Sequence, residues 1–196
     1  MGLIFDMGNV LSLDVDVLPP IAAKLGMTVE QIVGFAGDDF DELLTGAITA
    51  EELWEAFNEH FGTNVREDLL ITLFHPVTDQ RVARLILDLK AAGQRVVCGT
   101  NCFEKHYLYH LERGEYAVFD KIYASHLMKV AKPSPAFWAH ILEQEGWQAR
   151  ETFFIDDGAA NVVAARDLGI HSLLYESFEQ LREWLAEKRV LPTRRT

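Results

Sequence analysis

Residues 152–175 carry the sequence TFFIDDGAANVVAARDLGIHSLLY, in which two short apolar segments flank a helix-like stretch. The segments TFFI (152–155) and HSLLY (171–175) are largely apolar on both faces, as buried parallel strands are. Between them a helix is predicted to begin near Ala159 and to end at Gly169, because glycine is common just beyond a helix C-terminus. A strand, a helix and a second strand in this order predict a parallel sheet covered by helices.

Three more segments of the same kind occur earlier in the chain: GLIF (2–5), RVVCG (95–99) and KIYAS (121–125). Helical patterns lie between the strands, at 82–89 and from Ser134 and Pro135 onward, a pair typical of a helix N-terminus. The sequence therefore predicts an α/β fold with a Rossmann-like, three-layer parallel sheet.

The stretch 14–74 interrupts this alternation, because its apolar residues have helical spacing throughout. Thr28 with Gln31 and Thr49 with Glu52 are typical of capping boxes at helix N-termini. We expect an α/β core made of residues 1–13 and 75–196, and a helical cap made of residues 14–74. Ligands of open α/β sheets bind beyond the carboxyl ends of the strands, so an insertion that follows the first strand is placed to act as a lid.

The composition is that of a folded globular protein, with 49% hydrophobic and 24% charged residues. The formal net charge of −12 makes a broad basic surface for nucleic acid or anionic lipid unexpected. Cys98 and Cys102 form neither a disulfide framework nor a zinc motif. The N-terminal segment lacks the basic start of a signal peptide, and no run approaches the roughly 18 apolar residues of a membrane span. We therefore expect a cytoplasmic protein without a nucleic-acid or membrane partner; the sequence does not indicate an oligomeric state.

Polar residues follow four of the predicted strands directly or in the next loop. Each alone is explained by a turn or a helix cap. Together they bring three carboxylates, one cation and one hydroxyl to the same edge of the sheet, and such carboxylates repel one another unless a cation lies among them. A hard ion such as Mg²⁺, bound by Asp6, a backbone carbonyl and Asp156, is the expected solution. The residues concerned are Asp6, Thr100, Asn101, Lys132, Asp156 and Asp157.

The order of these residues, and the strings FDMGNV, KPSPAFW and IDDGAANVVAA, resemble the haloacid dehalogenase superfamily of phosphohydrolases. The position of the helical insertion is similar to that superfamily's C1 cap. Together with the stretch LLTGAITAEELWEAF, these strings are most similar to the branch that includes bacterial α-D-glucose-1-phosphate phosphatase.

The resemblance implies a Mg²⁺-dependent phosphatase that acts on a small phosphate monoester, with a sugar phosphate as the expected substrate. Asp6 would be the nucleophile that carries the phosphoryl group, and Thr100 and Lys132 would bind the phosphoryl oxygens. The implied metal ligands are Asp6, the Gly8 carbonyl, Asp156 and Asp157, with Asn161 near them. Thr100, Asn101, Lys132 and His106 are the candidate substrate-binding residues, although a place on a helix face or in the core is an alternative for His106.

One position departs from the superfamily pattern. Most of its phosphatases have an acid two residues after the nucleophile, where this chain has Gly8. General acid catalysis contributes roughly 10²- to 10⁴-fold, so we expect a preference for esters with good leaving groups. Asp14 or Asp16 is a possible substitute acid, although a hinge or capping role is favoured for both.

The predicted cap is strongly acidic, with one basic residue, Lys24, between positions 14 and 65. This charge predicts a neutral or cationic alcohol as the leaving group, whereas a merely solvated acidic face is the alternative. The eleven acidic residues are Asp14, Asp16, Glu30, Asp38, Asp39, Asp41, Glu42, Glu51, Glu52, Glu55 and Glu59.

Two other functions use a similar set of residues. A 2-haloacid dehalogenase would use Asp6 as nucleophile without a metal, but the aromatic residue usual at position 8 and an early cap arginine are missing; the first arginine is Arg66. A non-catalytic protein that binds a phosphorylated metabolite is the second alternative, although a binding protein has no need of a nucleophile.

Overall fold

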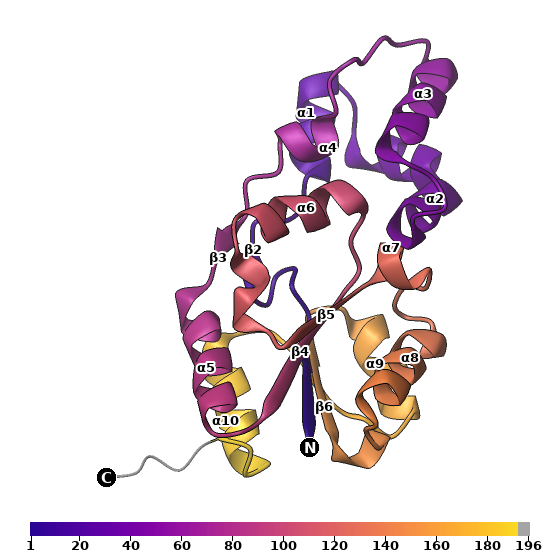
Figure 1. Ribbon diagram of the computed structural model, residues 1–196. Helices are drawn as coiled ribbons and strands as arrows, with labels where there is room; N and C mark the ends of the chain where they lie inside the picture. The colour runs from indigo at the N-terminus through magenta and orange to yellow at the C-terminus, as the bar shows by residue number, and fades with distance from the viewer. Residues whose placement is uncertain (192–196) are drawn as a thin grey trace.

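The structure is a computed structural model, and it describes residues 1–191 except for the side chain of Asp38. Its centre is a parallel five-stranded sheet with the strand order β5-β4-β1-β6-β7 (Figure 1). The strands are β1 (Gly2–Phe5), β4 (Arg95–Thr100), β5 (Lys121–Ala124), β6 (Thr152–Asp156) and β7 (His171–Leu174). The predicted α/β fold is therefore confirmed, and all five predicted strands are present.

Helices cover both faces of this sheet, as Figure 1 shows. On one face, α5 (Gln80–Ala91) and α10 (Phe178–Glu187) pack against side chains such as Leu3 and Phe5 of β1. On the other face, α8 (Pro135–Glu145) and α9 (Ala159–Asp167) pack against Ile4 and Phe154. Successive residues of a strand point to opposite faces, so the run GLIF supplies both cores.

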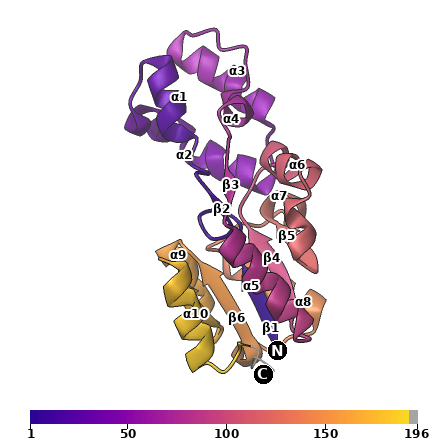
Figure 2. The ribbon, with the colours of Figure 1, turned by 90° about the vertical axis from the view of Figure 1, so that its left-hand side faces the viewer.

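The segment between β1 and α5 contains four helices, which form a unit above the sheet (Figure 2). They are α1 (Leu18–Leu25), α2 (Val29–Thr45), α3 (Ala50–Phe61) and α4 (Leu69–Thr72). Both predicted capping boxes, at Thr28 and Thr49, are confirmed. The unit has its own hydrophobic core, which includes Ile21, Leu53 and Leu70.

A short antiparallel pair, β2 (Ser12–Leu13) and β3 (Val77–Thr78), joins the two ends of this helical insertion. The sequence analysis did not predict it, because strands of two residues have no detectable alternation of polar and apolar side chains. The pair connects the segment that follows β1 with the segment that precedes α5, beside the carboxyl end of β1.

Three elements between β4 and α8 complete the core. They are α6 (Glu104–Glu112), the 3₁₀ turn Glu115–Val118 and the short helix α7 (Ser125–Met128). The predicted strand KIYAS ends one residue early, because Ser125 begins α7 and its hydroxyl bonds to Leu44 in α2 and to Cys102. A second 3₁₀ turn, Ala149–Glu151, precedes β6. No helix in the described range is both long and apolar enough to cross a bilayer.

Candidate active site

The polar residues predicted to converge do lie at one edge of the sheet. Asp6 directly follows β1, Thr100 is the last residue of β4, and Asp156 is the last residue of β6. Because β1 lies between β4 and β6 in the same parallel sheet, these residues end up beside one another. Lys132 reaches the same edge from the loop that precedes α8.

Three carboxylates form the centre of the site. Asp6, Asp156 and Asp157 each offer an oxygen, and these three oxygens lie within 4.8 Å of one another. Asp6 and Asp156 are buried, whereas Asp157 is exposed. The arrangement concentrates negative charge where little water is available to screen it.

The Lys132 ammonium lies between two of these carboxylates. Its Nζ atom is 2.9 Å from Asp6 Oδ1 and 2.6 Å from Asp156 Oδ2, and it donates a third hydrogen bond to the Gly99 carbonyl at 3.0 Å. All three of its N–H donors therefore have acceptors. Only 5% of the residue is exposed, so its charge acts at short range on Asp6 and Asp156.

Burial and charge together shift the pKa values at this site. Burial raises the pKa of Asp6 to about 7; Lys132 opposes this shift and Asp156 adds to it. Burial alone would lower the pKa of Lys132, but the two neighbouring carboxylates outweigh it and raise that pKa above its ordinary value. Lys132 is therefore a permanent cation, and additional positive charge beside Asp6 would favour its ionised, nucleophilic form.

Asn101 acts on Lys132 through the backbone. Its Nδ2 donates to the Lys132 carbonyl and its Oδ1 accepts from the Lys132 amide, both at 2.8 Å. The side-chain amide that was expected to contact substrate is thus engaged in holding the lysine loop. The structure places Asn101 as a residue that positions Lys132.

Each of the two consecutive aspartates has its own partners. Asp156 Oδ1 accepts from the Gly158 amide at 2.7 Å and from Asn161 Nδ2 at 2.9 Å. Asp157 Oδ2 accepts from Asn9 Nδ2 at 2.9 Å. Asn9 lies within the FDMGNV string, but no role was predicted for it from the sequence. Its backbone φ of 53° lies in the left-handed region, which asparagine tolerates. An asparagine in the sequence is only a weak signal of such a backbone position.

The donor set fits a hard divalent cation. Three carboxylates supply oxygen ligands, the type that Mg²⁺ prefers, and they also supply more negative charge than Lys132 alone neutralises. Among the described residues, no hydrogen bond ends on the Gly8 carbonyl, so this oxygen is available as a further ligand. Asn161 contacts Asp156 and not another acceptor, which suits a residue that orients a ligand.

A cavity of about 140 Å³ lies beside Gly8, Thr100 and Asn101, and we call it the leaving-group cavity after the role proposed for it below. Gly8, Thr100 and Asn101 form its inner end, and Val15 and Phe74, from the two ends of the helical insertion, also line it. The other lining residues are Met7, Cys102, His106, His110 and Tyr116.

His106 lies in the wall of the leaving-group cavity and is fixed in place. Its ring stacks on Phe74 with 3.6 Å between centroids, and its Nε2 donates to the Leu70 carbonyl of α4 at 2.8 Å. Burial lowers the pKa of His106 to about 4, so the ring is neutral near pH 7. The structure therefore places this predicted substrate-binding residue beside the site, as a neutral aromatic surface.

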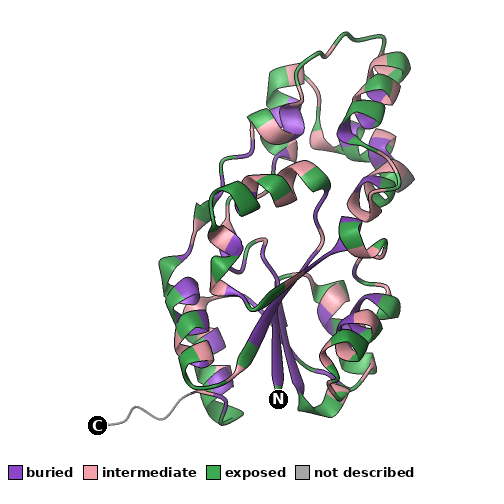
Figure 3. Ribbon diagram, in the orientation of Figure 1, coloured by how far each residue is buried: buried purple, intermediate pink, exposed green. Residues whose placement is uncertain are grey.

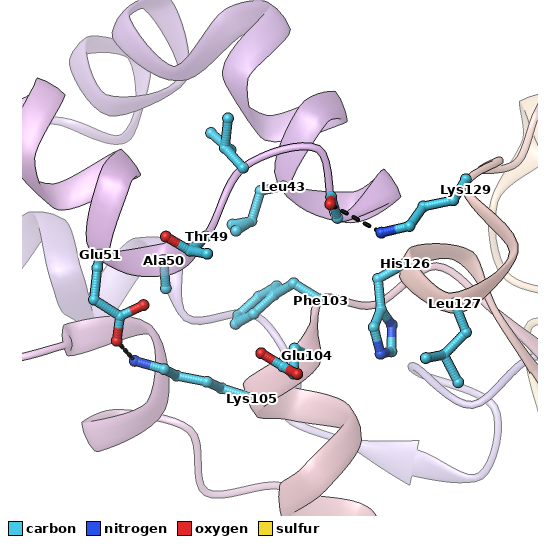
Figure 4. A pocket seen from close by; sticks show the side chains of 12 residues that line it. Leu43, Thr49, Ala50, Glu51, Phe103, Glu104, Lys105, His126, Leu127 and Lys129 are labelled. Carbon is cyan, nitrogen blue, oxygen red and sulfur yellow. Dashed lines mark hydrogen bonds and ion pairs between the residues drawn. The ribbon is translucent and has the colours of Figure 1, made fainter.

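The helical insertion contacts the core on both sides of a second cavity, a cleft of about 240 Å³ shown in Figure 4. At one end Lys105 forms ion pairs with Glu51 and Asp68. At the other end Lys129 donates to the Gly46 carbonyl at 3.0 Å. These contacts hold the helical insertion against α6 and α7.

The acidic residues of the helical insertion mostly face solvent, and none of those whose side chains the structure describes lines the leaving-group cavity. Asp16 accepts a hydrogen bond from the Leu18 amide just before α1, but the N-cap residue of this helix is Val17, which has no side-chain cap. This distribution agrees with a solvated acidic face, the alternative to electrostatic selection of the leaving group.

A model of the haloacid dehalogenase-like hydrolase family matches residues 1–169 of this chain. The chain belongs to this family. Its sesquiterpene phosphatase relative astK, from Aspergillus oryzae, is 30% identical over 179 residues, which cover 87% of each protein. Drimenol cyclase drtB from Aspergillus calidoustus is 25% identical over 94% of this chain, but the match spans 35% of that longer protein.

Solved structures of the family agree with this placement. A family enzyme from Bacteroides thetaiotaomicron, in complex with magnesium and inorganic phosphate, superimposes with a TM-score of 0.76 at 26% identity, covering 92% of this chain and 98% of that one. An L-2-haloacid dehalogenase from Xanthobacter autotrophicus has a TM-score of 0.62 at 18% identity, covering 97% of this chain and 84% of that one, and thus shares the fold.

The two cysteines of this haloacid dehalogenase-like hydrolase lie in β4 and directly after it. Cys98 and Cys102 are free thiols and both are buried. Burial raises the pKa of Cys102 to about 12, and that of Cys98 is raised as well. Both side chains therefore remain unreactive thiols near neutral pH.

Proposed function

We propose that this hydrolase is a Mg²⁺-dependent phosphatase that cleaves a small phosphate monoester through an aspartyl-phosphate on Asp6. The observation that carries the proposal is that Asp6 lies beside both the Lys132 ammonium and two further carboxylates. A nucleophilic carboxylate, a fixed cation and a set of oxygen ligands are the groups that phosphoryl transfer requires. The family enzyme solved with magnesium and phosphate supports the same assignment.

In the first step Asp6 Oδ2 attacks phosphorus and the P–O bond to the alcohol breaks, so that the leaving oxygen departs with the electron pair and takes a proton from water. Lys132 offsets the charge that gathers on the phosphoryl oxygens, and the Thr100 hydroxyl binds another of them. A magnesium ion held by Asp6, the Gly8 carbonyl, Asp156 and Asp157 would supply further positive charge at these oxygens. Water then attacks the acyl phosphate and releases inorganic phosphate.

The oxygen of the leaving alcohol has no general acid at position 8. Gly8 has no side chain to protonate it, and Asp16 is engaged at the start of α1. The enzyme should therefore act best on esters whose alcohols are good leaving groups. A series of phosphate esters with graded leaving-group pKa tests this; a rate of the chemical step independent of that pKa refutes it.

Two classes of neutral alcohol compete as the leaving group. The motif strings favour a sugar phosphate, whereas the sesquiterpene phosphatase relative favours the ester of an apolar alcohol. The helical insertion, residues 14–74, would serve as the lid that covers either of them. Two free thiols and a net charge of −12 support a cytoplasmic location without a nucleic-acid partner.

The decisive experiment is a phosphatase screen over sugar phosphates, aryl phosphates and nucleotides with Mg²⁺, with Asp6→Asn as the matched control. We expect hydrolysis that EDTA abolishes and that the variant lacks. Beryllium fluoride, which mimics a phosphoryl group on a carboxylate, should bind the wild type and not the variant. Hydrolysis by Asp6→Asn at the wild-type rate would contradict the proposal.

A 2-haloacid dehalogenase is less well supported by the same site. Among the described residues, no arginine lines the leaving-group cavity, and Arg66 lies exposed with its guanidinium on Asn64. Dehalogenation of 2-chloropropionate in the presence of EDTA would favour that alternative.

A further inference from the structure

We infer that the alcohol part of the substrate is apolar and occupies the leaving-group cavity, so that the enzyme selects esters of apolar alcohols over sugar phosphates. The inference rests on the proposed phosphatase function and adds a substrate class to it. Its basis is the chemistry of the cavity wall beside Gly8, Thr100 and Asn101.

The described residues that line this cavity include no lysine, arginine, aspartate or glutamate. Apolar groups come from Met7, Val15, Phe74 and Cys102, and the rings of His106, His110 and Tyr116 complete the wall. When an apolar ligand binds against such a wall, its apolar surface is removed from water, and no charged side chain of the wall has to be desolvated.

Four polar side-chain atoms of the wall are already in use. The Asn101 amide is bonded to Lys132, the His106 Nε2 donates to Leu70, and the His110 Nδ1 is paired with Glu115. The Tyr116 hydroxyl is buried and has no partner among the described residues, so it can satisfy one further polar atom. The second ring nitrogens of His106 and His110 also have no hydrogen bond among the described residues, and the Thr100 hydroxyl is assigned to the phosphoryl group. A sugar carries several hydroxyl groups, and the wall offers few partners for them.

An unpaired buried hydroxyl weakens binding by roughly fivefold to a hundredfold, because it loses its hydrogen bonds to water. A site with few partners therefore discriminates against a polyol of the same size. The missing side chain at position 8 leaves additional space: a Cβ built there would lie 3.4 Å from Val15 Cγ2 and touch little else.

The cleft of Figure 4 is a second cavity close to this one, and an alcohol too long for the leaving-group cavity would meet it next. Phe103 lies between the two cavities, because its ring packs on His106 at 4.0 Å and also lines the cleft. Leu43 and Leu127 add apolar groups to the lining of this cleft. The charged Lys105 and Lys129 at the ends of the cleft already have partners within the protein.

The test compares two esters with the same linkage and ring size, cyclohexylmethyl phosphate and glucose 6-phosphate. Both are titrated by calorimetry into Asp6→Asn with Mg²⁺, so that binding is measured without turnover. We expect cyclohexylmethyl phosphate to bind at least tenfold more tightly. Equal affinities, or tighter binding of glucose 6-phosphate, would overturn the inference.

A matched pair of variants locates the effect. Val15→Thr, made in the Asp6→Asn protein, adds a hydroxyl to the cavity wall at nearly constant volume and should lower the preference about threefold or more. Val33→Thr makes the same change on the exposed surface of α2 and should leave the preference unaltered. A preference that both variants alter equally, or that neither alters, would refute the assignment of this cavity.

The substrate-class inference and the proposed phosphatase function can be refuted independently of each other. Absence of Asp6-dependent hydrolysis of 4-nitrophenyl phosphate counts against the function, whatever the binding preference. Hydrolysis of that ester together with preferred binding of glucose 6-phosphate counts against the substrate class alone.

Discussion

Replacement of Lys132 by methionine removes the one cation between Asp6 and Asp156 and keeps a side chain of similar size. The ammonium is 2.9 Å and 2.6 Å from the two carboxylates, and the residue is 5% exposed. Without it, two buried carboxylates and the nearby Asp157 face one another with no compensating charge. We expect the folded state to lose stability as well as activity.

The size of the loss follows from this geometry. Removing one partner of a buried ion pair costs about 3–5 kcal/mol, because the remaining charge stays desolvated and unpaired. For a chain of this length, each kcal/mol lowers the melting temperature by roughly 2–4 °C, which predicts a decrease of about 6–20 °C. Protonation of Asp6 relieves part of the cost, and its pKa, already raised to about 7 by burial, rises further without Lys132.

The sign of the pH dependence is fixed by that shift. The unfolded chain ionises Asp6 near pH 4, whereas the folded variant holds the proton to a higher pH. Stability of the variant should therefore fall as pH rises from about 4 through 8. The loss relative to wild type should be larger at pH 8 than at pH 6.

The assay is thermal unfolding of wild type and Lys132→Met at both pH values, with and without Mg²⁺. Lys188→Met serves as control, since Lys188 is exposed at the end of α10 and should shift stability by less than about 0.5 kcal/mol. Mg²⁺ should raise the melting temperature of Lys132→Met more than that of wild type, because the ion replaces the missing positive charge. A loss below about 1 kcal/mol, or equal stabilisation of both proteins by Mg²⁺, would refute the reasoning.

Four further predictions concern other parts of the chain. Gly8→Asp should raise the rate for esters with poor leaving groups by up to about 10²-fold and change that for 4-nitrophenyl phosphate little, since the site tolerates a Cβ; equal effects on both esters in steady-state kinetics would contradict this. Burial lowers the pKa of His106 to about 4, so the wild type should lose up to about 3 kcal/mol of stability as pH falls from 6.5 to 4, where the unfolded chain binds a proton that the folded protein does not. His106→Gln should lack this loss in denaturant titrations. Cys98 and Cys102 should resist iodoacetamide at pH 8 until the protein is unfolded, as mass spectrometry would show; labelling of the folded protein would disprove their burial. Thr49→Ala should lower stability by about 1 kcal/mol through loss of the α3 cap, and a Thr49→Ser variant should retain most of it.

The sequence by itself determined the sheet and the residues at its edge. Short apolar runs such as GLIF and TFFI are local signals, and each is followed by an aspartate. In a parallel sheet all strands end at the same edge, so Asp6 and Asp156 could be placed together without coordinates. The capping boxes at Thr28 and Thr49 are equally local, because their donors and acceptors lie three residues apart.

Only the tertiary structure decided how the remaining groups are used. Asn101 was expected at the substrate, and the structure adds that its side-chain amide holds the Lys132 loop. Asn9 reaches Asp157 across 148 positions of sequence. The stacking of His106 on Phe74 depends on where the helical insertion rests on the core. Such contacts join segments far apart in the chain, and their geometry arises from packing, which no local pattern of residues encodes.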